Sequence, residues 1–282
     1  MHSEIDQAER TESALRCWIC GALADSREHR IKRSDIVRRY GRKSFQDLGG
    51  MLHFVAGEAH EVQGPSVKSL TYDPLICSDC NNTKSQPWDK AYEQFELWVF
   101  EHSKEILKRR FIMMEKVFGS DSFSAACPAL YKYFVKAFGC RLVSSGIMVP
   151  DDLVSLLSKD QFCAKLRLTF AVNKTVLFLE ENDRENYLGL GDLIRMDSRS
   201  MGMMKRYLWH MQIGWLRVWF FYNTDVPCGI GSAWCSNSAC VYLGEFETIS
   251  IDHLIEDAHR RNDDSSLTRL EALRDQDGIK IE

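Results

Sequence analysis

The stretch Cys77-Ser78-Asp79-Cys80-Asn81-Asn82-Thr83-Lys84 decides how this chain folds, because it holds two cysteines separated by two residues. A second pair with the same spacing, Cys17-Trp18-Ile19-Cys20, stands upstream. Two such pairs supply four thiolates, which is the ligand set of a structural zinc site. We therefore predict that Cys17, Cys20, Cys77 and Cys80 bind Zn²⁺. Redox use is less favoured, because neither pair heads a helix after a clear strand.

A different set of polar residues lies just inside the two cysteine pairs. The dipeptide Glu28-His29 stands between them, and Asn81 directly follows Cys80. Carboxylate, amide and imidazole groups suit a hydrolytic divalent ion better than they suit a thiolate-bound zinc. The segment around the dipeptide, residues 27–43, carries eight Lys or Arg and two acids, whereas the whole chain has a net charge of -4. Such a basic segment favours phosphate contact, although an ordinary solvated surface gives the same pattern.

The order of these motifs resembles the zinc-containing branch of the HNH endonucleases. The resemblance rests on Cys17-x2-Cys20, then Glu28-His29, then Cys77-x2-Cys80-Asn81-x2-Lys84, and it covers residues 15–100. It implies a ββα-metal (treble-clef) fold in which zinc is structural. It also implies that His29 is the catalytic base and that Glu28 and Asn81 hold a catalytic Mg²⁺ or Mn²⁺ ion. The expected activity is hydrolysis of phosphodiester bonds in nucleic acid, with DNA as the expected substrate and defence against foreign DNA as the setting.

The chemistry of the residues agrees with these roles. An unperturbed imidazole titrates near neutral pH and therefore suits a general base. The cationic side chains expected to contact phosphates are Arg30, Lys32, Arg33 and Lys84. The family pattern has a middle asparagine a few residues before the second cysteine pair, where it helps to orient the catalytic base. Here no asparagine lies between His29 and Cys80, and Tyr72 or Asp73 stands at roughly the position of that asparagine. The departure favours an alternative, a non-catalytic zinc-stabilised module that binds nucleic acid or protein.

Hydrophobic periodicity predicts an α+β protein with three parts. These are an HNH-like zinc nuclease domain (1–100), a helical connector (101–160) and a C-terminal α+β domain (161–282) whose antiparallel sheet packs with helices. Helices are predicted over 34–39, from 86 towards 117, and over 128–138, 150–157 and 251–274. Strands are predicted over 27–32, 51–55, 66–70, 166–172, 176–179, 207–213, 216–222 and 241–249.

The remaining sequence features indicate the cellular compartment of the protein and the state of its cysteines. Ten cysteines at uneven spacing do not form a secreted disulfide scaffold, and the start of the chain is polar. No apolar run is long enough to span a bilayer, so we expect a cytoplasmic protein without a membrane partner. Cys228, Cys235 and Cys240 are predicted to be buried thiols. Trp209, Trp215 and Trp219 could stack bases, but a Trp stripe on a predicted strand indicates core residues. The C-terminal domain is expected to recognise the target, sense a signal or form a homodimer.

Overall fold

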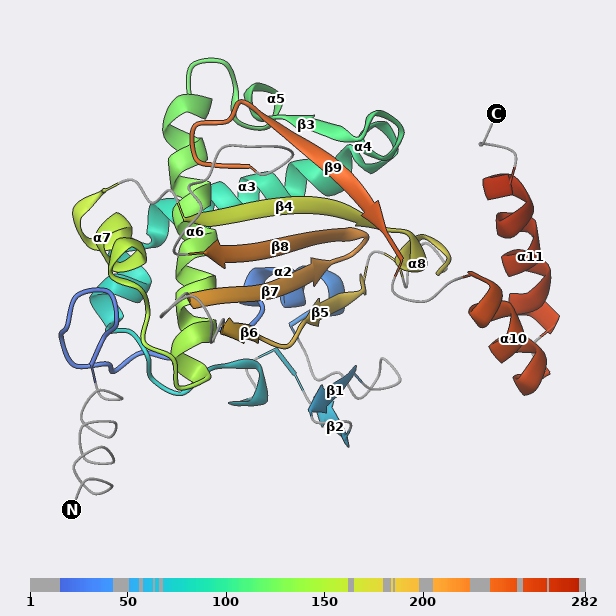
Figure 1. The fold of residues 1–282 in the computed structure, drawn as a ribbon, viewed down its shortest axis with the longest axis horizontal. Coiled ribbons are helices and arrows are strands. Elements are labelled where there is room, and N and C mark those ends of the chain that lie inside the picture. The colour runs from blue at the N-terminus through green and yellow to red at the C-terminus, as the bar shows by residue number, and fades with distance from the viewer. Residues whose placement is uncertain are drawn as a thin grey trace.

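The computed structural model describes residues 16–42, 51–55, 58–62, 64–65, 68–161, 165–179, 184, 186–197, 205–223, 234–247, 251–262 and 264–278. Helices and strands are mixed along the chain, and the helices gather on a twisted sheet (Figure 1). The predicted α+β class is confirmed. Cys228 lies outside the described residues, and Cys235, predicted to be a thiol, is disulfide-bonded.

The helices begin and end where local signals place them. The α-helices are α2 (Arg33–Tyr40), α3 (Gln86–Glu101), α4 (Ser103–Arg109), α5 (Met114–Phe118), α6 (Phe123–Ser144), α7 (Asp151–Lys159), α8 (Lys174–Leu177), α10 (Ile251–Arg261) and α11 (Asp264–Gly278); η2 (Lys68–Leu70) is a short 3₁₀ turn and η3 (Asp79–Lys84) a π-helical turn that leads into α3. Gly41 and Gly119 follow the last residues of α2 and α5 with positive φ angles, 83° and 84°. Glycine adopts this conformation without steric cost, so both helices stop there.

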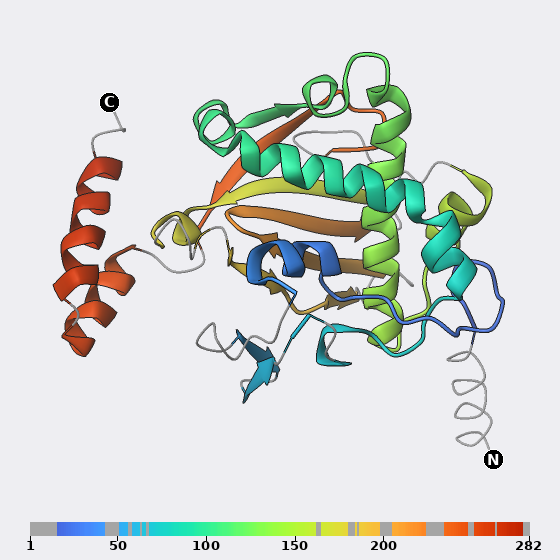
Figure 2. The ribbon, with the colours of Figure 1, turned by 180° about the vertical axis from the view of Figure 1, so that it is seen from behind.

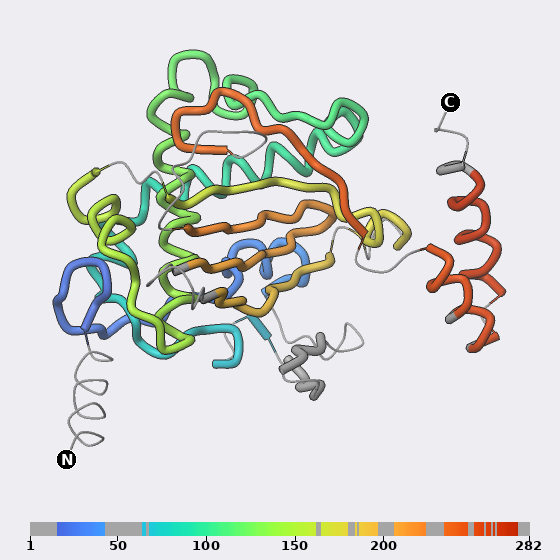
Figure 3. Tube along the Cα trace, viewed as in Figure 1, coloured from blue at the N-terminus to red at the C-terminus, as the bar shows by residue number. Residues whose placement is uncertain are grey.

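Among the described residues, seven strands form one sheet, and two more form a separate hairpin. The hairpin consists of β1 (Met51–Val55) and β2 (Glu58–Val62); the sheet consists of β3 (Phe111–Met113), β4 (Leu166–Asn173), β5 (Leu188–Leu190), β6 (Ile194–Asp197), β7 (Lys205–Ile213), β8 (Leu216–Asn223) and β9 (Cys240–Phe246). The sheet order is β3-β9-β4-β8-β7-β5, and β6 also pairs with β7. Figure 3 shows β9 returning from late in the chain to lie beside β4.

The prediction of an antiparallel sheet is wrong at one pair of strands. β4 and β9 run parallel, with Phe170 opposite Leu243, whereas β4–β8 and β7–β8 are antiparallel. Parallel neighbours need a long crossover connection, and here the chain from β4 to β9 passes through β5, β6, β7 and β8. Local alternation of apolar residues is the same for both pairing directions, so the sequence pattern could not distinguish them.

Helices α3 and α6 cross one face of the sheet (Figure 2). Aromatic side chains pack between these helices and the sheet. Phe170 of β4 has no exposed surface, and its ring centroid lies 5.9 Å from that of Phe95 and 5.8 Å from that of Phe134. Trp209 and Trp215 are buried, as predicted for core residues, whereas Trp219 is only partly buried. At the β7–β8 turn, a Cβ on Gly214 would meet Phe100 at 2.6 Å, so only glycine fits there.

One continuous core runs from the cysteine pairs to the sheet. Most buried hydrophobic residues between Cys17 and Leu243 belong to one hydrophobic cluster, which includes members of all three predicted parts of the chain, whereas Ile36 and Leu70 form a small cluster of their own. The division at residues 100 and 160 stays a prediction. A separate small cluster joins Phe178 to Ile255, Ala258 and Leu270, and α10 and α11 stand at the side of the molecule near α8 (Figure 1).

Several short elements differ from their prediction. Residues 174–177 form helix α8 instead of a strand, because a short apolar run cannot reveal its period. The helix predicted from 86 towards 117 ends at Glu101, and a left-handed residue, Arg110 (φ 60°), then turns the chain into β3. Residues 27–32 form only isolated backbone bridges. No helix in the described part of the chain has the length and apolar character needed to cross a membrane.

The aromatic packing at Phe170 generates a stability prediction. Replacing a fully buried Phe by Ala costs about 3–5 kcal/mol, because the removed ring leaves a cavity between α3, α6 and β4. We expect Phe170→Ala to lower the free energy of unfolding by about this amount in chemical denaturation. Tyr242→Ala is the control, because Tyr242 is 60% exposed and should change stability little. Equal losses in the two variants would contradict this account of the core.

Candidate metal centre and active site

The four predicted zinc ligands come together in space. The sulfur atoms of Cys17, Cys20, Cys77 and Cys80 all lie within 4.8 Å of one another, and Cys20 Sγ is 3.6 Å from Cys77 Sγ. Zinc–sulfur bonds of about 2.3 Å in a tetrahedron place sulfur atoms about 3.8 Å apart. The cluster therefore has the size and the donor set of a four-thiolate metal site, and its predicted membership is confirmed.

Backbone turns aim the four sulfur atoms at one point. In the first pair, Gly21 has φ 78° and its N–H donates to the Cys17 carbonyl at 2.8 Å. In the second pair, the Cys80 N–H approaches Cys77 Sγ at 3.5 Å. Burial raises the pKa of the Cys17 and Cys80 thiols, which disfavours bare thiolates. A bound cation would reverse this effect, because coordination deprotonates a thiol outright.

The segment after the first cysteine pair runs antiparallel to the segment before the second. Ser26 bridges Ile76, and His29 bridges Thr71. The Tyr72 N–H donates to the Glu28 carbonyl at 2.9 Å. Two paired segments followed by a helix is the order that the HNH resemblance implies. The ββα-metal nuclease domain itself stays a prediction.

His29 is held by a backbone group that the sequence did not suggest. The carbonyl of Pro65 acts on its ring and raises its pKa, whereas its buried Nε2 makes no hydrogen bond among the described residues. Burial lowers the pKa of His29, and the nearby cations Arg33 and Lys32 lower it further, while the Pro65 carbonyl acts in the opposite direction. The net effect favours a neutral imidazole whose Nε2 can accept a proton.

Neither candidate for the missing asparagine contacts His29 through its side chain in the structure. Tyr72 is buried, and the Arg30 guanidinium lies 4.7 Å from its ring centroid. Asp73 is exposed and pairs with Arg27 at 3.8 Å. The backbone carbonyl of Pro65, from the intervening loop, is the acceptor that acts on the His29 ring. A backbone acceptor from an intervening loop leaves no signal in a side-chain motif, so sequence reasoning missed it.

Glu28 points away from solvent and pairs with a lysine. Its Oε1 lies 3.2 Å from Nζ of Lys136, which comes from the middle of α6. Lys136 also lies 3.1 Å from Asp89 Oδ1 and 3.3 Å from Ser85 Oγ. Lys32 closes the network on its outer side, at 3.2 Å from Asp89 Oδ1. Lys136 was missed because it stands in an apolar helix, although a lone Lys among core positions signals a buried ion pair.

Asn81 fastens the start of the helical segment to the first paired segment. Its side-chain amide donates to Ser26 Oγ at 2.9 Å and to the Arg27 carbonyl at 3.3 Å. Its side-chain Oδ1 makes no hydrogen bond among the described residues, whereas its backbone carbonyl accepts one from Ser85 Oγ at 2.5 Å. Asn81 is therefore positioned beside the Glu28-His29 segment, and its NH2 group is used in hydrogen bonds that join the two segments.

The four predicted phosphate-binding cations have different surroundings. Lys32 pairs with Asp89 and Glu93, and Lys84 pairs with Asp79 at 3.0 Å. The Arg30 side chain donates to the Thr71 carbonyl. Arg33 is exposed and makes no ion pair within the described part of the chain. Arg33 is consequently the cation near His29 that is best placed to receive a phosphate.

Part of the basic segment serves the fold instead of a ligand. Arg38 and Arg39 of α2 both pair with Glu96 of α3, and Glu96 is only 2% exposed. The buried Asp35 accepts a hydrogen bond from the Tyr92 hydroxyl at 2.5 Å, so it does not cap α2 as its position suggested. The basic segment 27–43, which the sequence suggested as a phosphate-facing surface, therefore includes charged residues that instead hold α2 against α3.

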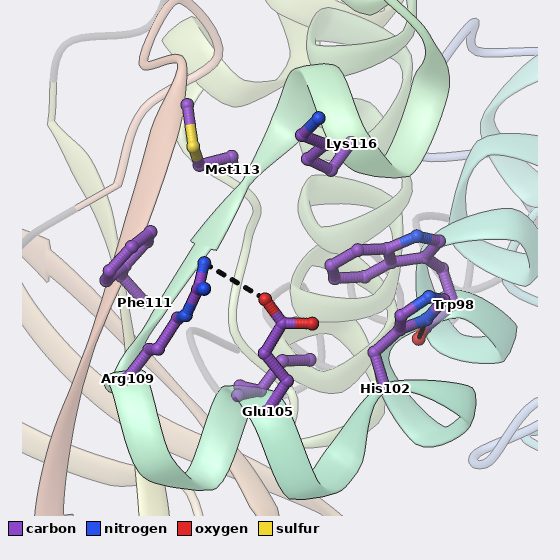
Figure 4. Close-up of a pocket in the computed structure, with 8 residues that line it drawn as sticks. Trp98, His102, Glu105, Arg109, Phe111, Met113 and Lys116 are labelled. Carbon is purple, nitrogen blue, oxygen red and sulfur yellow. Dashed lines mark hydrogen bonds and ion pairs between the residues drawn. The ribbon is translucent and has the colours of Figure 1, made fainter.

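A hollow of about 430 Å³ lies elsewhere, where α3, α4, β3 and α5 meet (Figure 4). Trp98 and His102 stack on one side with ring centroids 4.2 Å apart, and Glu105 pairs with Arg109 at 3.0 Å on the other. None of its lining residues is a predicted site residue. The hollow is therefore separate from the His29 site.

Comparison with protein-family models, with curated proteins and with solved structures gives no match for this chain.

The cysteine cluster predicts a measurable metal content. Protein purified in reduced form should carry about one zinc per chain, since four thiolates close one tetrahedral site. Cys77→Ser should lose the zinc and destabilise the fold, because metal binding and folding are coupled at such sites. Elemental analysis measures the metal, and circular dichroism the fold. Cys127→Ser is the matched control, since Cys127 is buried outside the cluster. Zinc retained by Cys77→Ser would contradict the assignment.

Proposed function

We propose that this protein is a zinc-stabilised endonuclease of the HNH type that hydrolyses phosphodiester bonds in DNA. The observation that carries the proposal is the setting of His29. Its imidazole lies near the Pro65 carbonyl, and its Nε2 makes no hydrogen bond among the described residues, on a segment that two cysteine pairs enclose. A role in defence against foreign DNA is the biological setting that the resemblance suggests.

His29 would act as the general base. A neutral imidazole accepts a proton from water, and the nearby Pro65 carbonyl, which raises the pKa of His29, favours the imidazolium that forms. The exposed Arg33 would receive a phosphate oxygen and hold the scissile group near the ring. Zinc would be structural when bound, because a four-thiolate site leaves no open position for a reactant.

The catalytic Mg²⁺ or Mn²⁺ ion that the resemblance implies fits these residues poorly. Of its two expected ligands, Glu28 is neutralised by Lys136, which leaves only the Asn81 Oδ1 without a partner among the described residues. The proposal therefore rests on His29 and Arg33, with Glu28 and Asn81 in supporting roles.

The alternative is a module that binds nucleic acid or protein without cutting it. The Glu28–Lys136 ion pair favours this alternative, because it leaves the expected cation site already compensated. Both functions would use the same exposed cationic side chains, so binding alone does not separate them.

Cleavage by a His29 variant tests the proposal. Removing a general base should reduce the rate about 100-fold or more while leaving the fold and zinc intact. A plasmid-nicking assay with Mg²⁺, with Mn²⁺ and with neither compares wild type with His29→Ala. His259→Ala is the matched control, since His259 is an exposed histidine on α10. Wild type that binds DNA but never nicks it would favour the binding module. Equal nicking by His29→Ala would exclude His29 as the base.

The surroundings of His29 also predict a pH profile. Because burial and the neighbouring cations lower the pKa of His29, the base is unprotonated at neutral pH. The cleavage rate should fall only as pH drops below the usual histidine value of about 6.5. Arg33→Gln removes one of these cations, so the acid limb should move to higher pH. Single-turnover rates between pH 5 and 8 measure the limb, and one that lies above pH 7 would contradict a depressed pKa.

A further inference from the structure

The ammonium group of Lys136 lies inside an oxygen cage. Its side chain is only 2% exposed although it carries a charge. Glu28 Oε1 lies at 3.2 Å, Asp89 Oδ1 and Oδ2 at 3.1 and 3.4 Å, and Ser85 Oγ at 3.3 Å. Carboxylate and hydroxyl oxygens of this kind are the ligands that Mg²⁺ and Mn²⁺ also prefer.

We infer that Lys136 supplies a built-in cation at the position where Glu28 and Asp89 would otherwise bind a divalent ion. The distances of 3.1–3.4 Å suit an ammonium–oxygen contact, whereas Mg²⁺ requires oxygens at about 2.0–2.1 Å. The structure therefore assigns Glu28 to an internal ion pair. This differs from the role of metal ligand that the HNH resemblance implies.

Charge balance supports the assignment. Two carboxylates, Glu28 and Asp89, balance the two ammonium groups Lys136 and Lys32 in the less exposed part of the network, and the more exposed Glu93 is a further partner of Lys32. Buried charges are tolerated when they are paired and hydrogen-bonded. The two carboxylates also raise the pKa of Lys136, overcoming the opposing effect of burial, so the ammonium form is retained. A divalent ion in the same cage would face an adjacent ammonium group and an excess of positive charge.

The inference concerns binding and holds whether or not the protein cuts DNA. In the intact chain, Mn²⁺ should bind no more weakly to Glu28→Gln than to wild type. Lys136→Met leaves an uncompensated carboxylate and an open position, so this variant should gain a Mn²⁺ site at least tenfold tighter than wild type. Adding Glu28→Gln to Lys136→Met should abolish the gain. Electron paramagnetic resonance of free Mn²⁺ on zinc-loaded protein measures each affinity.

Two further variants control for charge and for folding. Lys136→Arg keeps the cation and should resemble wild type. Lys132→Met removes a lysine one turn earlier on α6, whose partner is Asp160, and should gain no site. If Lys136→Met is unstable, its melting temperature should rise with Mn²⁺ while that of wild type does not.

The outcomes separate clearly. A folded Lys136→Met that binds Mn²⁺ no better than wild type would overturn the inference. A wild-type Mn²⁺ site that Glu28→Gln weakens would overturn it too, even if Lys136→Met cannot be produced. An unchanged affinity in Glu28→Gln supports it. Loss of cleavage in His29→Ala bears only on the proposed function, so the two ideas can fail independently.

Discussion

The cluster of four sulfur atoms is the constraint on which the N-terminal half of the structure depends. It joins residues 17–20 to residues 77–80 and closes a loop that contains α2 and the β1–β2 hairpin. Loop-closure entropy grows only logarithmically with length, so a long insertion between the cysteine pairs adds little cost. Closure sets the Glu28-His29 segment against residues 70–76, and the second pair then leads directly into α3. The position of His29 follows from this arrangement.

Buried charge attaches this closed loop to the rest of the molecule. Glu96 binds two arginines of α2, and Lys136 of α6 binds Glu28 and Asp89. Removing one partner of a buried pair costs more than the pair contributes, because the remaining charge is left in a low-dielectric site. Such pairs therefore determine which surfaces can pack together. Here they hold α2, α3 and α6 in one arrangement beside the cysteine cluster.

Sequence patterns predicted the features that depend on local spacing. The membership of the cysteine cluster, the start of α3 near Pro87 and the alternating core residues of β4, β7 and β8 all follow from periods of two to four residues. The features that were missed depend on contacts between distant segments. The Pro65 carbonyl, the Lys136 ammonium and the parallel β4–β9 pairing each join residues that no spacing rule relates. Their partners become evident only once the chain is folded.

The site also shows that a motif and its chemistry can be separated. Thiolates and backbone pairing are sufficient to position His29, and neither requires a divalent ion beside it. The acid next to His29 pairs with a lysine in this structure, and an ammonium group supplies positive charge to the same oxygens that a bound metal would contact. A dipeptide such as Glu28-His29 identifies where a base and an acid stand. The residues that surround the acid, here Lys136, Asp89 and Ser85, determine which cation it holds.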